Sequence, residues 1–415
     1  MLKIIVNAYA MCPGMGSEQG MSWNWCSNLA RHCELFIITE SEYKDKILSL
    51  VKEFPYGENM HFYWNEVSPT VRNMCWNQGD WRFYYYYRKW QLRTADIARD
   101  IVKKIRTEQG NTTGVILHQL NMIGFREPGY LWKVAEEYNI PFVWGPVDAK
   151  DGFPMAYAYG SSLRIVFFLM LKNLINRFQL KYGFRSHKAA DVASCVIGAS
   201  SNSVISFKKY FNKNAVLINE TGCRVAEYIY KENRVEKDTL DVLWVGKMDF
   251  RKQLALALNI VAESGIESIK LHIVGGGDDE QYRRVAKDIN IADKCKWYGV
   301  LRHEDVQILM QQCDLLLFTS VAEGTPHVVL EAIANSLPVI CFDTCGQGDC
   351  VNNTIGRKVP LTTPKQSVHD FAGHLKYFAE HRDELRKMSE ACIERAKELS
   401  WENKISKLLS IYEKL

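Results

Sequence analysis

Short runs of hydrophobic residues alternate with amphipathic stretches along the chain, and the alternation occurs in both halves. The first half has apolar runs of strand length at residues 2–9, 34–40, 61–67, 114–120, 141–147 and 194–200. The second half has them at residues 241–247, 271–277, 295–300, 315–320 and 338–343. Continuous apolar runs are typical of parallel strands that are covered on both faces, and helical periodicity fills most of the intervals. The pattern therefore predicts two doubly wound α/β domains.

The domain boundary is predicted in the polar stretch near residues 205–216. A chain of 415 residues is too long for one ordinary core and fits two domains of roughly 200 residues each. We therefore expect an N-terminal Rossmann-like domain over residues 1–210 and a C-terminal one over residues 211–395. The remaining segment, residues 396–415, has the pattern of an amphipathic helix.

Composition limits the classes of protein to which the chain can belong. With 47% hydrophobic and 24% charged residues it is of the soluble globular type, and a net charge of +4 does not indicate a nucleic-acid partner. No apolar run approaches the ~18 residues that span a bilayer, and the N-terminus lacks the pattern of a signal peptide. Twelve cysteines are scattered without a C-x-x-C pair, which favours reduced thiols in the cytoplasm over disulfides or zinc.

Candidate chemistry is sought just after each strand, because ligands of open parallel sheets lie beyond the carboxyl ends of the strands. After the first strand, Gly14 and Gly16 allow close approach of a ligand, and a helix expected from near Ser17 offers free N–H groups to an anion. A dinucleotide site with Glu40 as ribose ligand is an alternative, although the spacing G-x-G-x-x-x-G has one residue too many for it. A plain tight turn is the third interpretation.

His118 ends the fourth predicted strand, where a ligand would lie. A histidine at this place is a candidate for catalysis, and a structural hydrogen-bonding role is the equally open alternative. Arg126 follows in a loop, where an ordinary surface charge is the simpler interpretation.

The first strand of the C-terminal domain is followed by several cations. Lys247, Arg251 and Lys252 flank a turn between a strand and a helix, and such a group indicates an anionic ligand, most simply a phosphate. A solvated basic turn is the alternative. The glycines at 275–277 precede a helix whose first turn is acidic, which disfavours a phosphate there. We interpret these glycines as close backbone packing near a base or ribose.

The stretch EGTPHVVLE, residues 323–331, follows the predicted strand at 315–320. Glu323 lies at the strand tip, Thr325 is a suitable N-cap, and Pro326 suits the first helical position. Glu331 would lie about one and a half turns into the helix. Carboxylates suit hydroxyl-rich ligands and helix N-termini suit phosphates, and a nucleotide sugar has both groups.

These residues together resemble the retaining glycosyltransferases of family 4, which have the two-domain GT-B fold. The resemblance covers most of the chain and is carried by the E-x7-E element with the following AIANSLPVICFD, by VGKMDFRK, by LHIVGGG, and by CPGMGSEQG with WNW after it. In this order and spacing the set is specific, whereas E-x7-E alone would not be. The GT-B fold implies that the final helix, residues 396–415, crosses back to the first domain.

The resemblance also implies how the donor would be held. Glu331 would bind the ribose hydroxyls and Glu323 the transferred sugar. Gly324, Thr325 and nearby backbone N–H groups would hold the diphosphate.

The remaining roles that the resemblance implies concern charge and the reacting carbon. Lys247 and Lys252 would neutralise the diphosphate, although the family usually has arginine in place of Lys247, and lysine lacks the bidentate fork. His118 would touch the donor sugar near the reacting carbon. The glycine-rich loop would face the phosphates and the acceptor through Gly14, Gly16, Ser17 and Glu18.

Leaving-group catalysis follows from these roles. Cations and helix N–H groups would stabilise charge on the departing diphosphate, so that no metal and no cofactor is expected, and front-face attack would retain the anomeric configuration. The expected partners are a nucleotide sugar and a glycan or lipid-linked acceptor of cell-surface polysaccharide synthesis. A nucleotide-sugar epimerase of the same architecture, a dinucleotide-dependent oxidoreductase and a non-catalytic sugar-binding relative remain alternatives.

Residues 161–190 contain six lysines or arginines and no acid, with large apolar residues at roughly helical spacing. A basic helix with a broad apolar face is typical of segments that lie in a membrane interface, and a core helix of the first domain is the equally open alternative. The stretch at 81–93 adds aromatic and basic residues without a carboxylate, which also favours the membrane-interface interpretation. On the first interpretation the protein would work at the cytoplasmic face of a membrane, and on the second simply in the cytoplasm.

Overall fold

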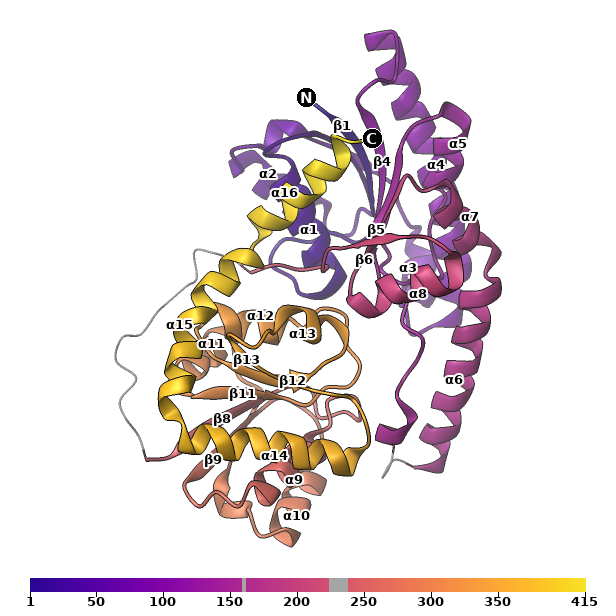
Figure 1. Cartoon of the computed structure of the whole chain (residues 1–415). Helices are drawn as coiled ribbons and strands as arrows, with labels where there is room; N and C mark the ends of the chain where they lie inside the picture. Colours follow the sequence, from indigo (N-terminus) through magenta and orange to yellow (C-terminus); the bar gives the residue numbers. More distant parts are fainter. Residues whose placement is uncertain (159–161, 224–237) are drawn as a thin grey trace. The chain divides into compact units, whose positions relative to one another are not determined.

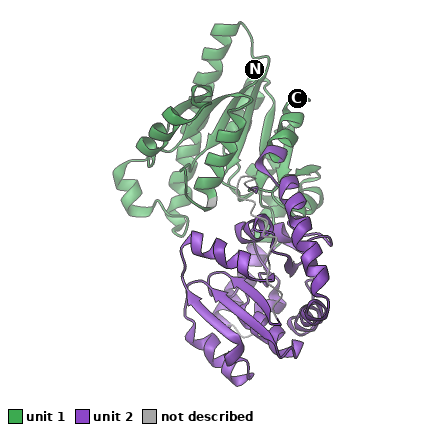
Figure 2. Cartoon of the chain, turned by 90° about the vertical axis from the view of Figure 1, so that its left-hand side faces the viewer, with its two compact units in different colours: residues 1–151, 176–221, 404–415 green, residues 152–175, 222–403 purple. Residues whose placement is uncertain are grey.

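The computed structural model describes residues 1–158, 162–223 and 238–415, and the chain path is traced in Figure 1. Contacts divide the chain into two compact units, coloured separately in Figure 2. The first unit comprises residues 1–151, 176–221 and 404–415, and the second comprises residues 152–175 and 222–403. Each unit has its own parallel sheet, so the prediction of two Rossmann-like domains is confirmed.

The sheet of the first unit has the strand order β3-β2-β1-β4-β5-β6-β7, and all neighbouring strands run parallel. Its strands within the described residues are β1 Lys3–Ala8, β2 Glu34–Thr39, β3 Met60–Trp64, β4 Val115–Asn121, β5 Phe142–Val147, β6 Cys195–Gly198 and β7 Ala215–Leu217. Every residue of β4 is buried, as expected for a strand near the middle of a sheet that is covered on both faces.

The sheet of the second unit has the order β10-β9-β8-β11-β12-β13, again with parallel neighbours. Its strands within the described residues are β8 Leu240–Val245, β9 Ile269–Val274, β10 Cys295–Gly299, β11 Leu315–Phe318, β12 Val339–Phe342 and β13 Gly356–Val359. Alternate apolar side chains of β8, β9 and β11 form one buried core with those of the helices α9 Leu254–Ser264 and α14 Pro364–Glu380.

The helices that connect these strands follow the predicted alternation. In the first unit they are α1 Ser17–Leu29, α2 Lys44–Glu53, α3 Pro69–Cys75, α4 Trp81–Gln109, α5 Leu131–Tyr138, α7 Phe184–Val192 and α8 Ser201–Phe211. In the second unit they are α9 Leu254–Ser264, α10 Glu280–Asp288, α11 His303–Gln312, α12 His327–Ala334, α13 Cys345–Cys350, α14 Pro364–Glu380 and α15 Arg382–Glu398. Two further helices, α6 Leu163–Tyr182 and α16 Trp401–Tyr412, each contribute residues to both units.

Membrane-spanning length is a separate property of these helices. Among the described residues, none of the helices combines the length and the apolar character needed to cross a bilayer.

The chain passes between the units at places other than those predicted. The stretch at 205–216 is not a linker, because α8 covers the first sheet and β7 pairs with β6 in it. An additional crossing places residues 152–175 with the second unit, where Tyr157 is buried and its hydroxyl lies 2.7 Å from Ser367 Oγ. The return to the first unit begins at Lys404, because α15 belongs to the second unit.

Candidate active site

In the second unit the carboxyl ends of β8 and β11 lie side by side where the strand order reverses. In open α/β sheets this switch point is where ligands bind. The segment after β8 carries Lys247 and Lys252, and the segment after β11 carries Ser320 and Glu323. The topology therefore brings together two groups of residues that are about seventy positions apart in the chain.

Lys252 and Glu323 form an ion pair at this edge. Lys252 Nζ lies 2.6 Å from Glu323 Oε1, and both side chains are largely buried. Ser320 Oγ donates a hydrogen bond of 2.5 Å to the same carboxylate oxygen, and the ammonium group lies 5.1 Å from the centre of the Phe318 ring. The ammonium and the carboxylate therefore balance each other's charge, and the serine fixes the carboxylate beside the strand tip.

Lys247 is exposed in the turn directly after β8. The glycine-rich segment after β9 packs against this turn, since Met248 N donates to Gly276 O at 2.8 Å. A Cβ atom on Gly275, whose φ is +146°, would lie 1.7 Å from Gly246 O. The predicted close backbone packing of residues 275–277 is therefore observed, and it holds the turn that carries Lys247.

The EGTPHVVLE stretch forms a loop followed by α12. Helix α12 begins at His327 with Pro326 as its N-cap and without a side-chain cap, so the predicted N-cap at Thr325 and first helical position at Pro326 are wrong. Helix α13 contacts this loop, because Gly346 N donates to Gly324 O at 3.0 Å. Thr325 is buried in this loop.

Glu331 lies on α12 with its side chain 29% exposed. Its Oε1 atom is 3.3 Å from Nε2 of His303, the first residue of α11. The two glutamates of the E-x7-E element therefore have different partners within the unit. Glu323 contacts Lys252 and Ser320, whereas Glu331 contacts His303. The carboxylate of Glu331 remains accessible enough to accept hydrogen bonds from a ligand.

In the first unit the glycine-rich loop lies between β1 and α1. Gly14 has a φ of +72°, and added Cβ atoms on Gly14 and Gly16 would meet nothing within 4 Å, so the loop is open. Helix α1 begins at Ser17 as predicted, while the role of the Ser17 side chain falls outside what the structure describes. Glu18 accepts hydrogen bonds from Ile123 N at 3.2 Å and Gln78 Nε2 at 3.0 Å, and burial raises the pKa of its carboxyl.

His118 is fully buried, so no part of its ring is exposed to a ligand in this structure. Its Nδ1 atom is 2.5 Å from Tyr412 Oη and its Nε2 atom 2.7 Å from Gly145 O, so both ring nitrogens are occupied inside the first unit. Burial lowers the pKa of His118 to about 4, although the bond to Gly145 acts in the opposite direction. The contacts of His118 are therefore those of a structural hydrogen-bonding residue.

The polar residues that reach the tip of β4 are others, which the sequence did not single out. Asn121 Nδ2 donates to Ser22 Oγ at 2.7 Å, and Gln119 Nε2 donates to Asn121 O at 2.7 Å. Asn7 of β1 donates to Gln119 Oε1 at 2.9 Å. The signal for them was the polar sequence HQLN at the end of an apolar strand.

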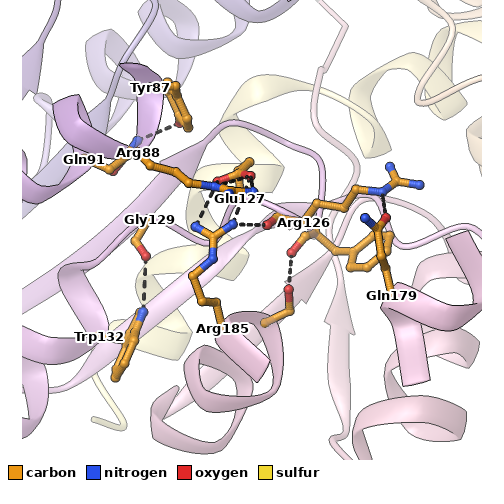
Figure 3. A network of polar contacts seen from close by, with 11 residues as sticks. Tyr87, Arg88, Gln91, Arg126, Glu127, Gly129, Trp132, Gln179 and Arg185 are labelled. Carbon is orange, nitrogen blue, oxygen red and sulfur yellow. Dashed lines mark hydrogen bonds and ion pairs between the residues drawn. The ribbon is translucent and has the colours of Figure 1, made fainter. Parts of the chain in front are cut away.

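A cluster of arginines surrounds Glu127 just beyond β4 (Figure 3). Glu127 is buried, and Arg88 Nη2 and Arg185 Nη2 each lie 2.9 Å from its Oε1 atom. Arg126 instead donates to the side-chain oxygens of Asn176 and Gln179 on α6. Sequence reasoning missed this cluster, because its members come from α4, the loop after β4 and α7 and share no local pattern. Arg126 is thus part of a network that ties α6 to the loop after β4.

Part of the chain is similar in sequence to known glycosyltransferases. Residues 226–399 match the model of the family described as Glycosyl transferases group 1, which is less than half of the chain. Over 121 residues the chain is 32% identical to lipopolysaccharide 1,6-galactosyltransferase of Escherichia coli K12, covering 28% of this chain and 32% of that protein. The chain thus spans about a third of the length of the curated relatives it matches.

Solved structures resemble the chain over its whole length. The lipopolysaccharide outer core galactosyltransferase WaaB in its apo form has a TM-score of 0.64 at 16% identity, with 100% of both chains covered. HepE of Anabaena, in complex with UDP, has a TM-score of 0.63 at 12% identity, again with 100% of both chains covered. At these identities the likeness concerns the fold. The chain therefore has the two-domain fold of GT-B glycosyltransferases, and its second unit is similar in sequence to the group 1 glycosyl transferases.

Proposed function

We propose that the protein is a retaining glycosyltransferase that moves a sugar from a nucleotide-diphosphate sugar to a hydroxyl group. The observation that carries this proposal is the Lys252–Glu323 pair at the switch point of the second sheet. Lys247 lies in the same segment after β8 as Lys252, and α12 begins four residues after Glu323. A cation, a carboxylate and backbone N–H groups at one edge suit a ligand that has both phosphates and hydroxyls.

In this proposal the donor lies across the carboxyl ends of β8 and β11. Glu331 accepts hydrogen bonds from the ribose hydroxyls, while Lys247 and Lys252 neutralise the diphosphate. Backbone N–H groups of Gly324 and Thr325 hold its oxygens. The diphosphate competes with Glu323 for the Lys252 ammonium group, and a lysine with three N–H donors can serve both. The carboxylate of Glu323 then accepts hydrogen bonds from the transferred sugar.

The chemical step is displacement at the anomeric carbon. The bond between that carbon and the diphosphate oxygen breaks, and the acceptor oxygen bonds to the same face of the carbon. The acceptor proton passes to a departing phosphate oxygen. Pre-oriented cations and N–H groups stabilise the negative charge as it develops, so that no metal and no cofactor is required in this proposal. His118 has no role in it, because its ring is enclosed in the first unit.

The acceptor is proposed to be a glycan or a lipid-linked intermediate of cell-surface polysaccharide synthesis. This is supported by the similarity to a lipopolysaccharide galactosyltransferase. The open loop with Gly14, Gly16 and Glu18, together with Ser17 at the start of α1, is the proposed contact of the first unit with phosphates and acceptor. We propose the cytoplasm as the compartment, which the scattered cysteines favour.

Product analysis tests the reaction. The protein is incubated with α-linked UDP-, GDP- and ADP-sugars and a short alcohol or glycan fragment, with and without EDTA, and the glycoside is examined by proton NMR. The expected result is an α-glycoside and free nucleoside diphosphate, unchanged by EDTA. A β-glycoside would contradict retention, and release of nucleoside diphosphate without any glycoside would favour an epimerase instead.

A further inference from the structure

Helix α6 has one face that is attached to the rest of the protein. Leu169 and Leu180 are buried on this face. Between them, Asn173 bonds to both backbone groups of Phe153 at 2.8 Å, and Asn176 Nδ2 donates to Lys150 O at 2.6 Å. These residues recur every three or four positions, which is the spacing of one side of an α-helix.

The opposite side of α6 carries large apolar side chains that are exposed. Six of them, 45% to 88% exposed, form what we call the α6 apolar stripe: Leu163, Phe167, Leu171, Leu174, Phe178 and Tyr182. Their spacing of three or four residues places them in one line along twenty residues of helix. Contiguous exposed apolar surface on this scale marks an interaction site in a soluble protein.

The charge of α6 differs from that of a helix that contacts another protein. Residues 162–182 contain Arg164, Lys172, Arg177 and Lys181 and no aspartate or glutamate. On a helix of 3.6 residues per turn, Lys172 and Arg177 lie on opposite sides of the stripe, beyond the exposed side chains of Phe168 and Met170. Arg164 and Lys181 lie near the two ends of the stripe. The apolar stripe is therefore framed by positive charge.

We propose that the α6 apolar stripe docks into the interfacial region of a membrane that contains anionic lipids. An apolar face framed by lysine and arginine suits the boundary between acyl chains and anionic headgroups. A second copy of the chain is a poorer occupant, because pairing α6 with α6 would bring cations together without any carboxylate on either helix. The core-helix interpretation fails, since only the attached face is buried.

Docking would hold the protein beside a lipid-linked acceptor, and that consequence alone rests on the proposed function. Binding to vesicles is measured without donor or acceptor. A failure of the docking proposal is therefore distinguishable from a failure of the transferase proposal.

Sedimentation with vesicles tests the electrostatic part. The full-length protein is mixed with vesicles of phosphatidylcholine alone, or of phosphatidylcholine with phosphatidylglycerol, and should sediment with the second kind. The variant Arg164→Gln/Lys172→Gln/Lys181→Gln should bind about a hundredfold more weakly, because each cation near an anionic surface contributes about fivefold. Arg177 is left in place because it pairs with Asp151.

A matched control removes the same charge elsewhere. Lys103, Lys104 and Arg106 are exposed on α4, and Lys103→Gln/Lys104→Gln/Arg106→Gln should bind the anionic vesicles like the wild type. If both triple variants bind the anionic vesicles equally weakly, binding depends on net charge alone and the proposal is overturned. Unchanged binding of the α6 variant would overturn it as well.

The apolar part has its own variant. Phe167→Ser/Leu174→Ser/Phe178→Ser should abolish sedimentation even at low salt, with an unchanged unfolding midpoint because these side chains are exposed. The control Leu92→Ser/Ile205→Ser/Ile308→Ser changes exposed residues of α4, α8 and α11 and should retain binding. If the wild type fails to sediment with either kind of vesicle, the proposal is overturned. If the wild type instead forms a dimer that Phe167→Ser/Leu174→Ser/Phe178→Ser dissociates, a second copy of the chain and not a lipid surface covers the α6 apolar stripe.

Discussion

The Lys252–Glu323 pair is the residue-scale feature on which the donor site depends. Two groups with opposite charge, 2.6 Å apart and largely buried, stabilise each other, so that a change in one alters the behaviour of the other. Sequence reasoning placed both residues at strand ends, but it assigned them to different parts of the donor. Their direct contact could not be predicted, because it depends on the adjacency of β8 and β11.

The two glutamates of the E-x7-E element should differ in their kinetic effects. Glu331→Ala removes the proposed ribose contact from an accessible carboxylate and should mainly weaken donor binding. Glu323→Ala removes the proposed contact with the transferred sugar and unpairs Lys252, and should mainly lower kcat. Steady-state kinetics and donor titration of both variants measure this division. Equal effects of both changes on kcat and on donor affinity would refute it.

His118 should make stability depend on pH. Its folded pKa of about 4 lies below the ordinary value of 6.5, so the unfolded chain binds more protons in this window and stability falls as pH falls. Between about pH 7 and about pH 5 the wild type should lose about 2 kcal/mol more than His118→Asn. Urea unfolding at the two pH values measures the difference. Parallel losses in both proteins would show that the histidine is not buried in its neutral form.

The orientation of His118 illustrates what strand periodicity leaves open. Alternation assigns residues to two faces, but β4 is buried on both, so neither face is marked as facing a ligand. The binding edge of such a strand is its tip, where Asn121 lies.

At the scale of elements, strands covered on both faces were predictable because they are continuously apolar. The two strands that were missed, β7 and β13, lie at sheet edges. β7 has two exposed residues out of three, and β13 has the sequence GRKV, so neither forms an apolar run. The start of α12 lies one residue later than predicted, because Thr325 belongs to the loop that Gly346 contacts.

Gly346 should therefore be intolerant of substitution. A Cβ atom on it would lie 2.5 Å from Gly324 O and 2.7 Å from Thr325 Cα, so the Gly324–Thr325 loop would have to move. We expect Gly346→Ala to reduce stability by about 1–3 kcal/mol and to weaken donor binding, although alanine favours the helix in which it lies.

The matched control for this change is Gly373→Ala in the middle of α14. An added Cβ there meets nothing within 4 Å, so the variant should gain about 0.5–1 kcal/mol and bind donor normally. Thermal unfolding and donor titration of the two variants distinguish the effect of the steric contact at Gly346 from the effect of helix propensity. A stabilised Gly346→Ala protein with normal donor binding would contradict the proposed role of the loop.

At the scale of the whole molecule, the number and class of the domains were predictable, and the chain crossings were not. The alternation of strands and helices repeats in each half and so indicates two sheets. The extra crossing that places Tyr157 in the second core carries no such signal, because only the short 3₁₀ helix Met155–Ala158 forms there. The final segment does return to the first unit, where Tyr412 meets His118.

The central claim is that the second unit binds a nucleotide-diphosphate sugar at the edge formed by β8 and β11. The most direct measurement is thermal unfolding of the whole chain with UDP-, GDP- and ADP-sugars and NAD, repeated with Lys252→Met and Glu331→Ala. A donor at a hundred times its Kd should stabilise the wild type by about 2.7 kcal/mol and should stabilise both variants less. If none of the nucleotide sugars raises the unfolding midpoint, or if NAD does so in their place, the claim is contradicted.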